Sequence, residues 1–349
     1  MRKIGRFFRA ILLTATVMAA ASLSAFAQEE TDALNADRET ELTAEEMEEA
    51  EKTAEEMEEA VQKLVDAFTG KIAGENAEEA EEDSTGIGAG TYNMLLIGVD
   101  RRDDSWNGNS DVMILVTVNP QKETIYLTSF MRDLYANIEG IGVRKLNAAC
   151  ANGGAKLCVK TIRDNYQVRI DNYALVDFYD MIDIVDIFGG VDVELTEAEV
   201  TKANSIAKAM CKARGVDFEE HQITGSGLVH LDGYLAVGHM RNRSTGGDSD
   251  FGRTARQREV LLALLEKMQG KDLTDMAKLI LEAQLNIEHD VDSATMLKLA
   301  AKLPSWLEYD VEQQRIPYDN LFYIQNEILT PNMDETIRIL QETLYLERR

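Results

Sequence analysis

The negative charge of this 349-residue chain is concentrated in one segment, and that segment limits where a core can form. Residues 28–90 hold 22 acidic and 4 basic side chains, so they carry −18 of the formal net charge of −26. They are rich in Glu and Ala and poor in large apolar side chains. Because such a segment buries too little apolar surface to fold alone, the globular part is predicted to be residues 91–349.

The acidic segment itself is predicted to be a solvated, partly helical stalk or linker. The run from Thr43 to Ala50 recurs ten residues later as Thr53 to Ala60. Ten residues is not a multiple of the heptad, and Glu on adjacent turns repels itself, so a stable coiled coil is disfavoured. The Gly-rich run from Gly86 to Gly90 predicts a hinge before the globular part.

Residues 1–27 have the layout of a secretory signal, with four basic residues ahead of an apolar run that ends in Ala25-Phe26-Ala27. The run also approaches the roughly 18 residues that begin to suffice for a membrane anchor. Both interpretations place the rest of the chain outside the cytoplasm, either secreted or anchored at the cell envelope.

Composition excludes several classes of protein. A chain that is 45% hydrophobic is not disordered throughout, and the acidic excess argues against nucleic-acid binding. Three cysteines exclude a disulfide-stapled scaffold and a four-thiolate zinc site, and the four histidines show no zinc spacing. Cys158 with Cys211 is the disulfide to test first, and three buried free thiols are the alternative.

From Tyr92 onward, apolar runs alternate with turn residues, which predicts one α/β domain with a covered central sheet. Strands are predicted at Met94 to Val99, Val112 to Val118, Thr124 to Ser129, Asn172 to Val176 and Val191 to Leu195. Helices are predicted at Leu146 to Asn165 with an interruption at Gly153-Gly154, Tyr179 to Phe188, Glu197 to Ala213, Leu231 to His239, Thr254 to Met268, Leu273 to Leu285, Asp292 to Lys302 and Asp334 to Leu346.

Charged residues follow the first and third predicted strands, at the strand ends where ligands bind in α/β folds. Asp100 ends the first strand, and Asp111 stands at the entrance to the second. A hairpin-like connection would bring the two carboxylates close together, where they either share a proton or hold a hard cation such as Mg²⁺. At the third strand end, Arg132-Asp133 is also explained by a surface ion pair.

Five arginines are concentrated between residues 241 and 258 of this acidic chain. Arg241 and Arg243 share one side of an extended segment, and residues 246–252 are predicted to form a flexible loop. Arg253, Arg256 and Arg258 then crowd the first turn of the predicted helix, where cations are disfavoured. Either acidic neighbours or a phosphate bound at the helix start would compensate them.

Several of these segments occur together in one order. They are Leu95 to Asp100 with Arg102, Ser110-Asp111, Arg132-Asp133, Lys145 to Ala149 with Gly153-Gly154, Val176 to Phe178, Phe188 to Val191, Leu231 to Gly233, Arg241-x-Arg243, and Asp250-Phe251-Gly252-Arg253-x-x-Arg256-Gln257. No single segment is decisive, but the ordered set resembles the LytR-CpsA-Psr family of cell-wall ligases, from about Tyr92 to the C-terminal helix.

The resemblance implies a three-layer α/β/α domain with a central mixed sheet and a long apolar pocket for a polyprenyl chain. It implies a phosphotransferase at the membrane surface that moves an anionic glycopolymer, such as a teichoic acid or a capsular or wall polysaccharide. The donor would be a polyprenyl-pyrophosphate carrier, the acceptor a peptidoglycan hydroxyl, and the cofactor Mg²⁺.

The resemblance also implies roles for individual residues. Asp100 and Asp111 correspond to Mg²⁺ positions. Asp250 is the candidate that activates the acceptor hydroxyl, and with Arg241 and Arg243, which would neutralise phosphate charge, it forms the predicted catalytic set. The predicted pyrophosphate-binding residues are Arg102, Arg132, Arg241, Arg243, Arg253 and Gln257, together with Arg256 from the arginine cluster.

Two other functions remain open from the sequence. A site that activates a hydroxyl also admits water, so a pyrophosphatase or phosphatase acting on the same carrier is one alternative. A non-catalytic envelope protein that binds lipid-linked glycan is the other. A transcription regulator is disfavoured, because the secretion signal and the acidic surface both oppose contact with DNA.

Overall fold

A computed structural model describes residues 90–346, apart from 102–105, 246–248 and most positions between 270 and 304. The described residues belong almost entirely to one compact unit, formed by Glu82–Gln269, Glu282–Val291 and Ser305–Arg349. The predicted signal or anchor, nearly all of the predicted stalk, Arg102 and most of the two helices predicted between 273 and 302 lie outside the described residues. Within the described part, no helix has the length and apolar character needed to cross a membrane.

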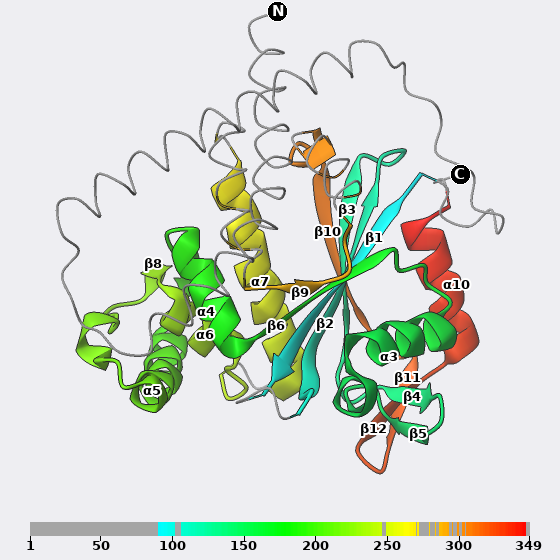
Figure 1. The fold of residues 1–349 in the computed structure, drawn as a ribbon, viewed down its shortest axis with the longest axis horizontal. Helices are drawn as coiled ribbons and strands as arrows, with labels where there is room; N and C mark the ends of the chain where they lie inside the picture. The colour runs from blue at the N-terminus through cyan, green and yellow to red at the C-terminus, as the bar shows by residue number, and fades with distance from the viewer. Residues whose placement is uncertain are drawn as a thin grey trace, which may run out of the picture. The chain divides into compact units, whose positions relative to one another are not determined.

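A six-stranded mixed sheet forms the centre of this unit (Figure 1). Its strands are β1 (Tyr92–Asp100), β2 (Asn109–Asn119), β3 (Thr124–Phe130), β6 (Asn172–Asp177), β9 (Glu288–His289) and β10 (Asp310–Ile316). In the order β10-β3-β2-β1-β6-β9, β2 is antiparallel to β1 and β3, whereas β6 is parallel to β1 and β10 is parallel to β3. The predicted central mixed sheet is therefore confirmed.

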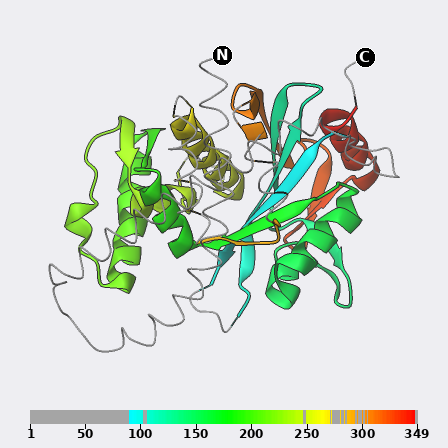
Figure 2. The same cartoon turned by 45° about the horizontal axis from the view of Figure 1, so that its top comes forward.

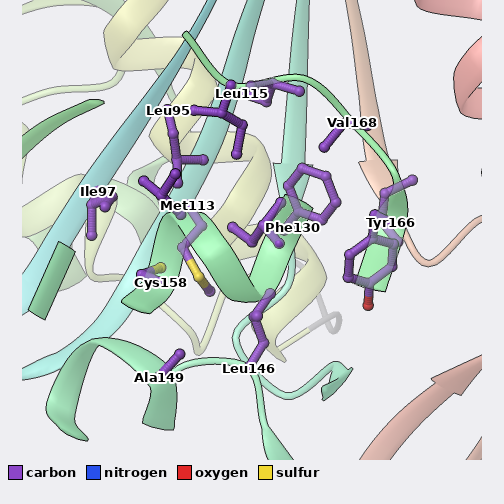
Figure 3. Packing of buried hydrophobic residues seen from close by; sticks show 14 of the residues in the cluster. Leu95, Ile97, Met113, Leu115, Phe130, Leu146, Ala149, Cys158, Tyr166 and Val168 are labelled. Carbon is purple, nitrogen blue, oxygen red and sulfur yellow. The ribbon is translucent and has the colours of Figure 1, made fainter. Parts of the chain in front are cut away.

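Helices α3 (Ala148–Tyr166) and α10 (Met333–Leu344) lie on one side of this sheet (Figures 1 and 2). The apolar residues of β1 alternate in burial, so that Leu95 and its alternate neighbours face a large core cluster beneath these helices. In that cluster the rings of Phe130 and Tyr166 lie 5.0 Å apart (Figure 3). The two-residue period of the strand thus selects the side chains that build this core.

The glycine pair predicted to interrupt the first helix does so. Gly153 and Gly154 have non-helical backbone angles inside α3, and Gly154 has a φ of +65°, which side chains with a Cβ rarely adopt. All three cysteines, Cys150, Cys158 and Cys211, are buried free thiols. The pairing of Cys158 with Cys211 is therefore not formed, and the free-thiol alternative holds.

Helix α7 (Ser249–Met268) lies on the opposite side of the sheet from α3 and α10 (Figures 1 and 2). Behind α7 a second apolar cluster joins α4 (Phe178–Ile187), α5 (Glu197–Arg214), α6 (Gly233–Met240) and the ribbon of β7 (Val191–Leu195) and β8 (Gly227–Leu231), and a short 3₁₀ helix (Phe218–Glu220) follows α5. Val260, Ala263 and Leu264 of α7 belong to this cluster. Helices therefore flank the sheet on both sides, as the α/β/α prediction requires.

Two further ribbons lie beside the third strand's end. They are β4 (Tyr135–Ile138) with β5 (Gly142–Lys145), and β11 (Phe322–Gln325) with β12 (Ile328–Pro331). A parallel bridge between Leu134 and Leu329 connects them. Figure 1 shows both ribbons at the end of the sheet where α7 begins.

Candidate functional site

Asp111 is the extra residue of a β-bulge between the first two strands. Gly98 pairs with Val112 and Val99 pairs with Ser110, so one residue of β2 has no opposite partner on β1. A bulge bends its strand and turns the extra side chain to a new direction. The Asp111 side chain therefore departs from the alternating directions of the side chains along β2. Its carboxylate, which is 11% exposed, lies among guanidinium groups.

Three arginines from different elements converge on this carboxylate. Arg132, just after β3, donates through one nitrogen to both Asp111 oxygens at 3.0 and 3.3 Å. Arg243, after α6, donates to Asp111 at 3.2 Å, and Arg253 of α7 lies 3.6 Å away. The strand ends and α7 thus meet at one charged cluster, although their sequence positions are more than a hundred residues apart.

Helix α7 begins earlier than the sequence predicts. It starts at Ser249 rather than Thr254, so the end of the predicted loop 246–252 is helical. The three arginines of this helix therefore lie in its second and third turns, and the first turn carries Asp250. The predicted crowding of cations at the helix start is wrong, because the residue at that end is an acid, which the helix dipole favours.

Asp250 is held by the same three arginines as Asp111. Arg132 Nε donates to Asp250 at 3.0 Å, and the guanidinium nitrogens of Arg253 and Arg243 lie 3.5 and 3.6 Å from its other oxygen. Burial acts to raise the pKa of Asp250, but the charges of these arginines outweigh burial and the pKa is lowered. Asp250 is therefore ionised at neutral pH.

Arg253 is the most unusual member of the cluster. Its side chain is 3% exposed, and the Nε and Nη2 atoms have no hydrogen-bond partner. Burial lowers the pKa of Arg253 to about 10, against the opposing effect of Asp111. A buried cation with unsatisfied donors is costly, and an anion in the adjacent space would satisfy it.

That space is a cleft of about 980 Å³ beside the cluster. Six predicted site residues line it, namely Asp100, Asp111, Arg241, Arg243, Arg253 and Gln257. Arg241 lies over the ring of Phe178 at 4.2 Å, a stacking contact that fixes its guanidinium plane at the cleft wall. Arg132 and Asp250 belong to the charged cluster but are not among the residues that line the cleft.

Arg256 is not brought into this cluster. It donates to Glu199 of α5 at 2.9 and 3.0 Å and to backbone and side-chain oxygens of Asn242 and Thr245. These hydrogen bonds connect α7 to α5 and to the segment after α6. Acidic neighbours, the alternative explanation of the arginine cluster, account for this arginine.

Sequence reasoning did not assign Lys145, and it explained Asp133 by a surface ion pair. Lys145 at the end of β5 lies 3.0 Å from Asp133, and Asp133 lies 3.7 Å from the Nε of Arg132. The adjacent Arg132-Asp133 pair indicated a charged site in the sequence. The sequence near Asp133 does not show that its ion-pair partner is Lys145. Lys202 of α5 also lines the cleft and was missed, because a lysine on a polar helix face is indistinguishable from its neighbours.

The residues present are compatible with Mg²⁺ held together with a phosphate ligand. Asp100 and Asp111 both line the cleft, and Mg²⁺ commonly takes one or two carboxylates and completes its shell with water and phosphate oxygens. Within the described ranges, no group of three or more His, Cys, Asp or Glu side chains is placed to hold a metal. The cleft therefore does not provide a purely protein-built cage.

Comparison with known proteins identifies the family of this chain. The model of the LytR_cpsA_psr family matches residues 47–343. The chain belongs to the LytR_cpsA_psr family. The suspected family is thus confirmed, and its ordered motifs are the ones that supply the arginines and carboxylates of the cluster.

Two curated relatives illustrate the similarity. Biofilm regulatory protein A of Streptococcus mutans is 33% identical over 229 residues, which are 60% of this chain and 52% of that protein. The polyisoprenyl-teichoic acid–peptidoglycan teichoic acid transferase TagU of Halalkalibacterium halodurans is 32% identical over 241 residues, or 67% of this chain and 73% of the relative. The chain thus spans about half the length of the first relative.

Solved structures of TagT share the fold. The crystal structure of the Bacillus subtilis protein has a TM-score of 0.55 at 25% identity, covering 76% of this chain and 95% of that one. TagT bound to LIIa-WTA has a TM-score of 0.57 at 25% identity, covering 78% and 96%.

Proposed function

We propose that this protein is an extracytoplasmic phosphotransferase, secreted or anchored at the cell envelope. It transfers an anionic glycopolymer from a polyprenyl-pyrophosphate carrier at the membrane surface to a hydroxyl of peptidoglycan. The names of the TagU relatives, polyisoprenyl-teichoic acid–peptidoglycan teichoic acid transferases, support a polyisoprenyl-linked donor and a peptidoglycan acceptor. The signal-like residues 1–27 support the location.

The observation that carries the proposal is the buried Arg253, which lines an arginine-rich cleft and has two nitrogens without a hydrogen-bond partner. Arg243 and Arg241 line the same cleft, and together they supply several forked donors to a diphosphate. Asp111 and Asp250 form ion pairs with Arg243 and Arg253. A pyrophosphate would compete for these arginines, which would release Asp111 to bind Mg²⁺ and Asp250 to accept a proton.

The reaction then needs no covalent enzyme intermediate. The acceptor hydroxyl attacks the phosphorus that carries the glycopolymer, the bond from that phosphorus to the bridging oxygen breaks, and polyprenyl phosphate leaves. Asp250, which contacts the cleft-lining Arg243 and Arg253, accepts the proton of the hydroxyl, while the arginines stabilise charge on the phosphate oxygens. Mg²⁺ held by Asp100 and Asp111 would add positive charge at those oxygens when bound.

The test is transfer of a radiolabelled glycan from a synthetic polyprenyl-pyrophosphate donor to peptidoglycan oligomers, with Mg²⁺ or with EDTA. Wild type is compared with Asp250→Asn and with Asp183→Asn, a control in which the carboxylate pairs with Arg214 at 3.1 Å outside the cleft. We expect labelled peptidoglycan from wild type and the control, and little from Asp250→Asn or in EDTA.

Other outcomes would reassign the protein. Release of free glycan without attachment to peptidoglycan would indicate a hydrolase of the same carrier. Tight donor binding with no turnover, unaffected by Asp250→Asn, would indicate a non-catalytic binding protein.

A further inference from the structure

We propose that Lys145 is a positioning residue of the transfer reaction, which acts through Asp133 to hold Arg132 and Asp250 in the arrangement that the reaction needs. This inference rests on the proposed function and adds a residue to its machinery. Lys145 itself lies behind the cluster, and it is not among the residues that line the cleft.

A chain of charged contacts starts at Lys145. Its ammonium lies 3.0 Å from one oxygen of Asp133, and the other oxygen of Asp133 lies 3.7 Å from Arg132 Nε. The same Nε donates to Asp250 at 3.0 Å. Two carboxylates therefore approach one nitrogen of Arg132, and Lys145 compensates the charge of Asp133 at its other oxygen.

Backbone hydrogen bonds hold this chain of contacts in place. Leu146 N donates to Leu134 O at 2.8 Å, and Asn147 N donates to Arg132 O at 3.1 Å, so the residues after Lys145 are fastened to those around Asp133. On the other side, Leu329 N of β12 donates to the Asp133 carbonyl at 2.8 Å. The backbone around the Lys145–Asp133 ion pair is thus held by hydrogen bonds on both sides, which is not expected for an incidental ion pair on the surface.

The charges around Asp250 favour its ionised form. Against the effect of burial, the cations Arg253, Arg132 and Arg243 lower the pKa of Asp250, and a side-chain hydrogen bond with Asp133 acts in the same direction. Lys145 neutralises Asp133, and the 90%-exposed Glu327 is a weaker partner of the same ammonium at 3.7 Å. Without Lys145, Asp133 would compete more strongly with Asp250 for Arg132, and this competition would weaken a contact that keeps Asp250 ionised.

The experiment compares the pH dependence of kcat for wild type, Lys145→Met and Lys145→Arg. Because Lys145 is 33% exposed and its charge is screened, we expect Lys145→Met to lose about fivefold in kcat on the acid side only. The acid limb of the pH profile moves to higher pH, and the KM for the donor changes less than kcat.

Two further variants test the explanation. Lys145→Arg should restore the pH profile, and adding Asp133→Asn to Lys145→Met should reverse the shift of the acid limb. Lys160→Met, which removes an ion-paired lysine from the surface of α3, is the control.

A second measurement does not depend on turnover. The carboxyl of Asp250, observed by ¹³C NMR in protein labelled at Asp and assigned from its absence in Asp250→Asn, should titrate at higher pH in Lys145→Met. Absence of transfer by wild type would overturn the proposed function, whereas the titration still tests the role of Lys145. The inference is wrong if Lys145→Met leaves both the profile and the titration unchanged, or if Lys160→Met shifts them equally.

Discussion

At the scale of single residues, two buried arginines on α7 show how burial alone differs from a binding site. Arg258 donates to Ser129 at 2.7 Å and to Gln313 at 2.9 Å, so it connects the helix to β3 and β10. Arg253 is equally buried, yet two of its nitrogens have no hydrogen-bond partner. The hydrogen-bond donors of Arg258 are satisfied within the fold, whereas those of Arg253 would be satisfied only by a bound anion.

Replacing each arginine by lysine separates these roles. Arg253→Lys keeps a charge but loses the forked donors, so we expect inorganic pyrophosphate to bind at least about tenfold more weakly, equivalent to about 1.4 kcal/mol. Arg258→Lys should lower stability and leave that affinity unchanged. Isothermal titration calorimetry with pyrophosphate measures the affinity of each variant. Equal losses of affinity in the two variants would show that general destabilisation explains the effect.

The lowered pKa of Asp250 predicts how acid affects stability. Its folded pKa lies below the unfolded value of about 3.9, so the ionised form adds stability that is complete well above that value and is lost as the pH falls through the folded pKa. Asp250→Asn should therefore be less stable than wild type by about 1–3 kcal/mol at neutral pH, and the difference should shrink toward pH ~3. Urea unfolding across this range measures it, with Asp183→Asn as a reference; a constant difference would contradict the prediction.

At the scale of elements, the sequence predicted what depends on local pattern and missed what depends on pairing. The apolar run before Asp100 identifies β1, because a buried strand needs no partner to be recognised. Strand β10 was missed, because most of its residues are polar and exposed. The bulge at Asp111 follows from the register of two strands, which no single segment encodes. The start of α7 was misplaced because Gly252 and the glycines before it favour a loop.

The bulge predicts a connection between strand packing and the site. A Cβ at Gly98 would lie 2.8 Å from the Cβ of Val112, the residue beside Asp111. Gly98→Ala should therefore cost about 1–3 kcal/mol through overpacking and shift the Asp111 carboxylate. We expect pyrophosphate affinity to fall together with stability. Leu340→Ala, in the core beneath α10, should lower stability without changing the affinity measured well below the unfolding temperature. An unchanged affinity in Gly98→Ala would show that the bulge absorbs the added methyl group.

At the scale of the whole described unit, the site joins two apolar clusters that are otherwise distinct. Arg132 and Asp111 come from the sheet, whose core lies toward α3 and α10. Arg243 follows α6, which packs in the second cluster with α4 and α5. Arg253 belongs to α7. Figure 1 shows that this helix lies between the sheet and those helices. The charges at the ends of several elements could be found in the sequence, but their convergence required the tertiary fold.

This arrangement predicts that an anion in the cleft stabilises both clusters together. Leu340→Ala and Leu235→Ala each remove a fully buried side chain, one from each cluster, and should each cost about 2–5 kcal/mol. Pyrophosphate at a hundred times its dissociation constant should return about 2.7 kcal/mol to both variants and to wild type, because it binds only where both clusters are folded. Thermal unfolding with pyrophosphate, compared with sodium sulfate at equal ionic strength, measures the gain. If Leu235→Ala shows an early transition that pyrophosphate does not raise, the helices α4 to α6 unfold independently of the site, and the cleft is built on the sheet and α7 alone.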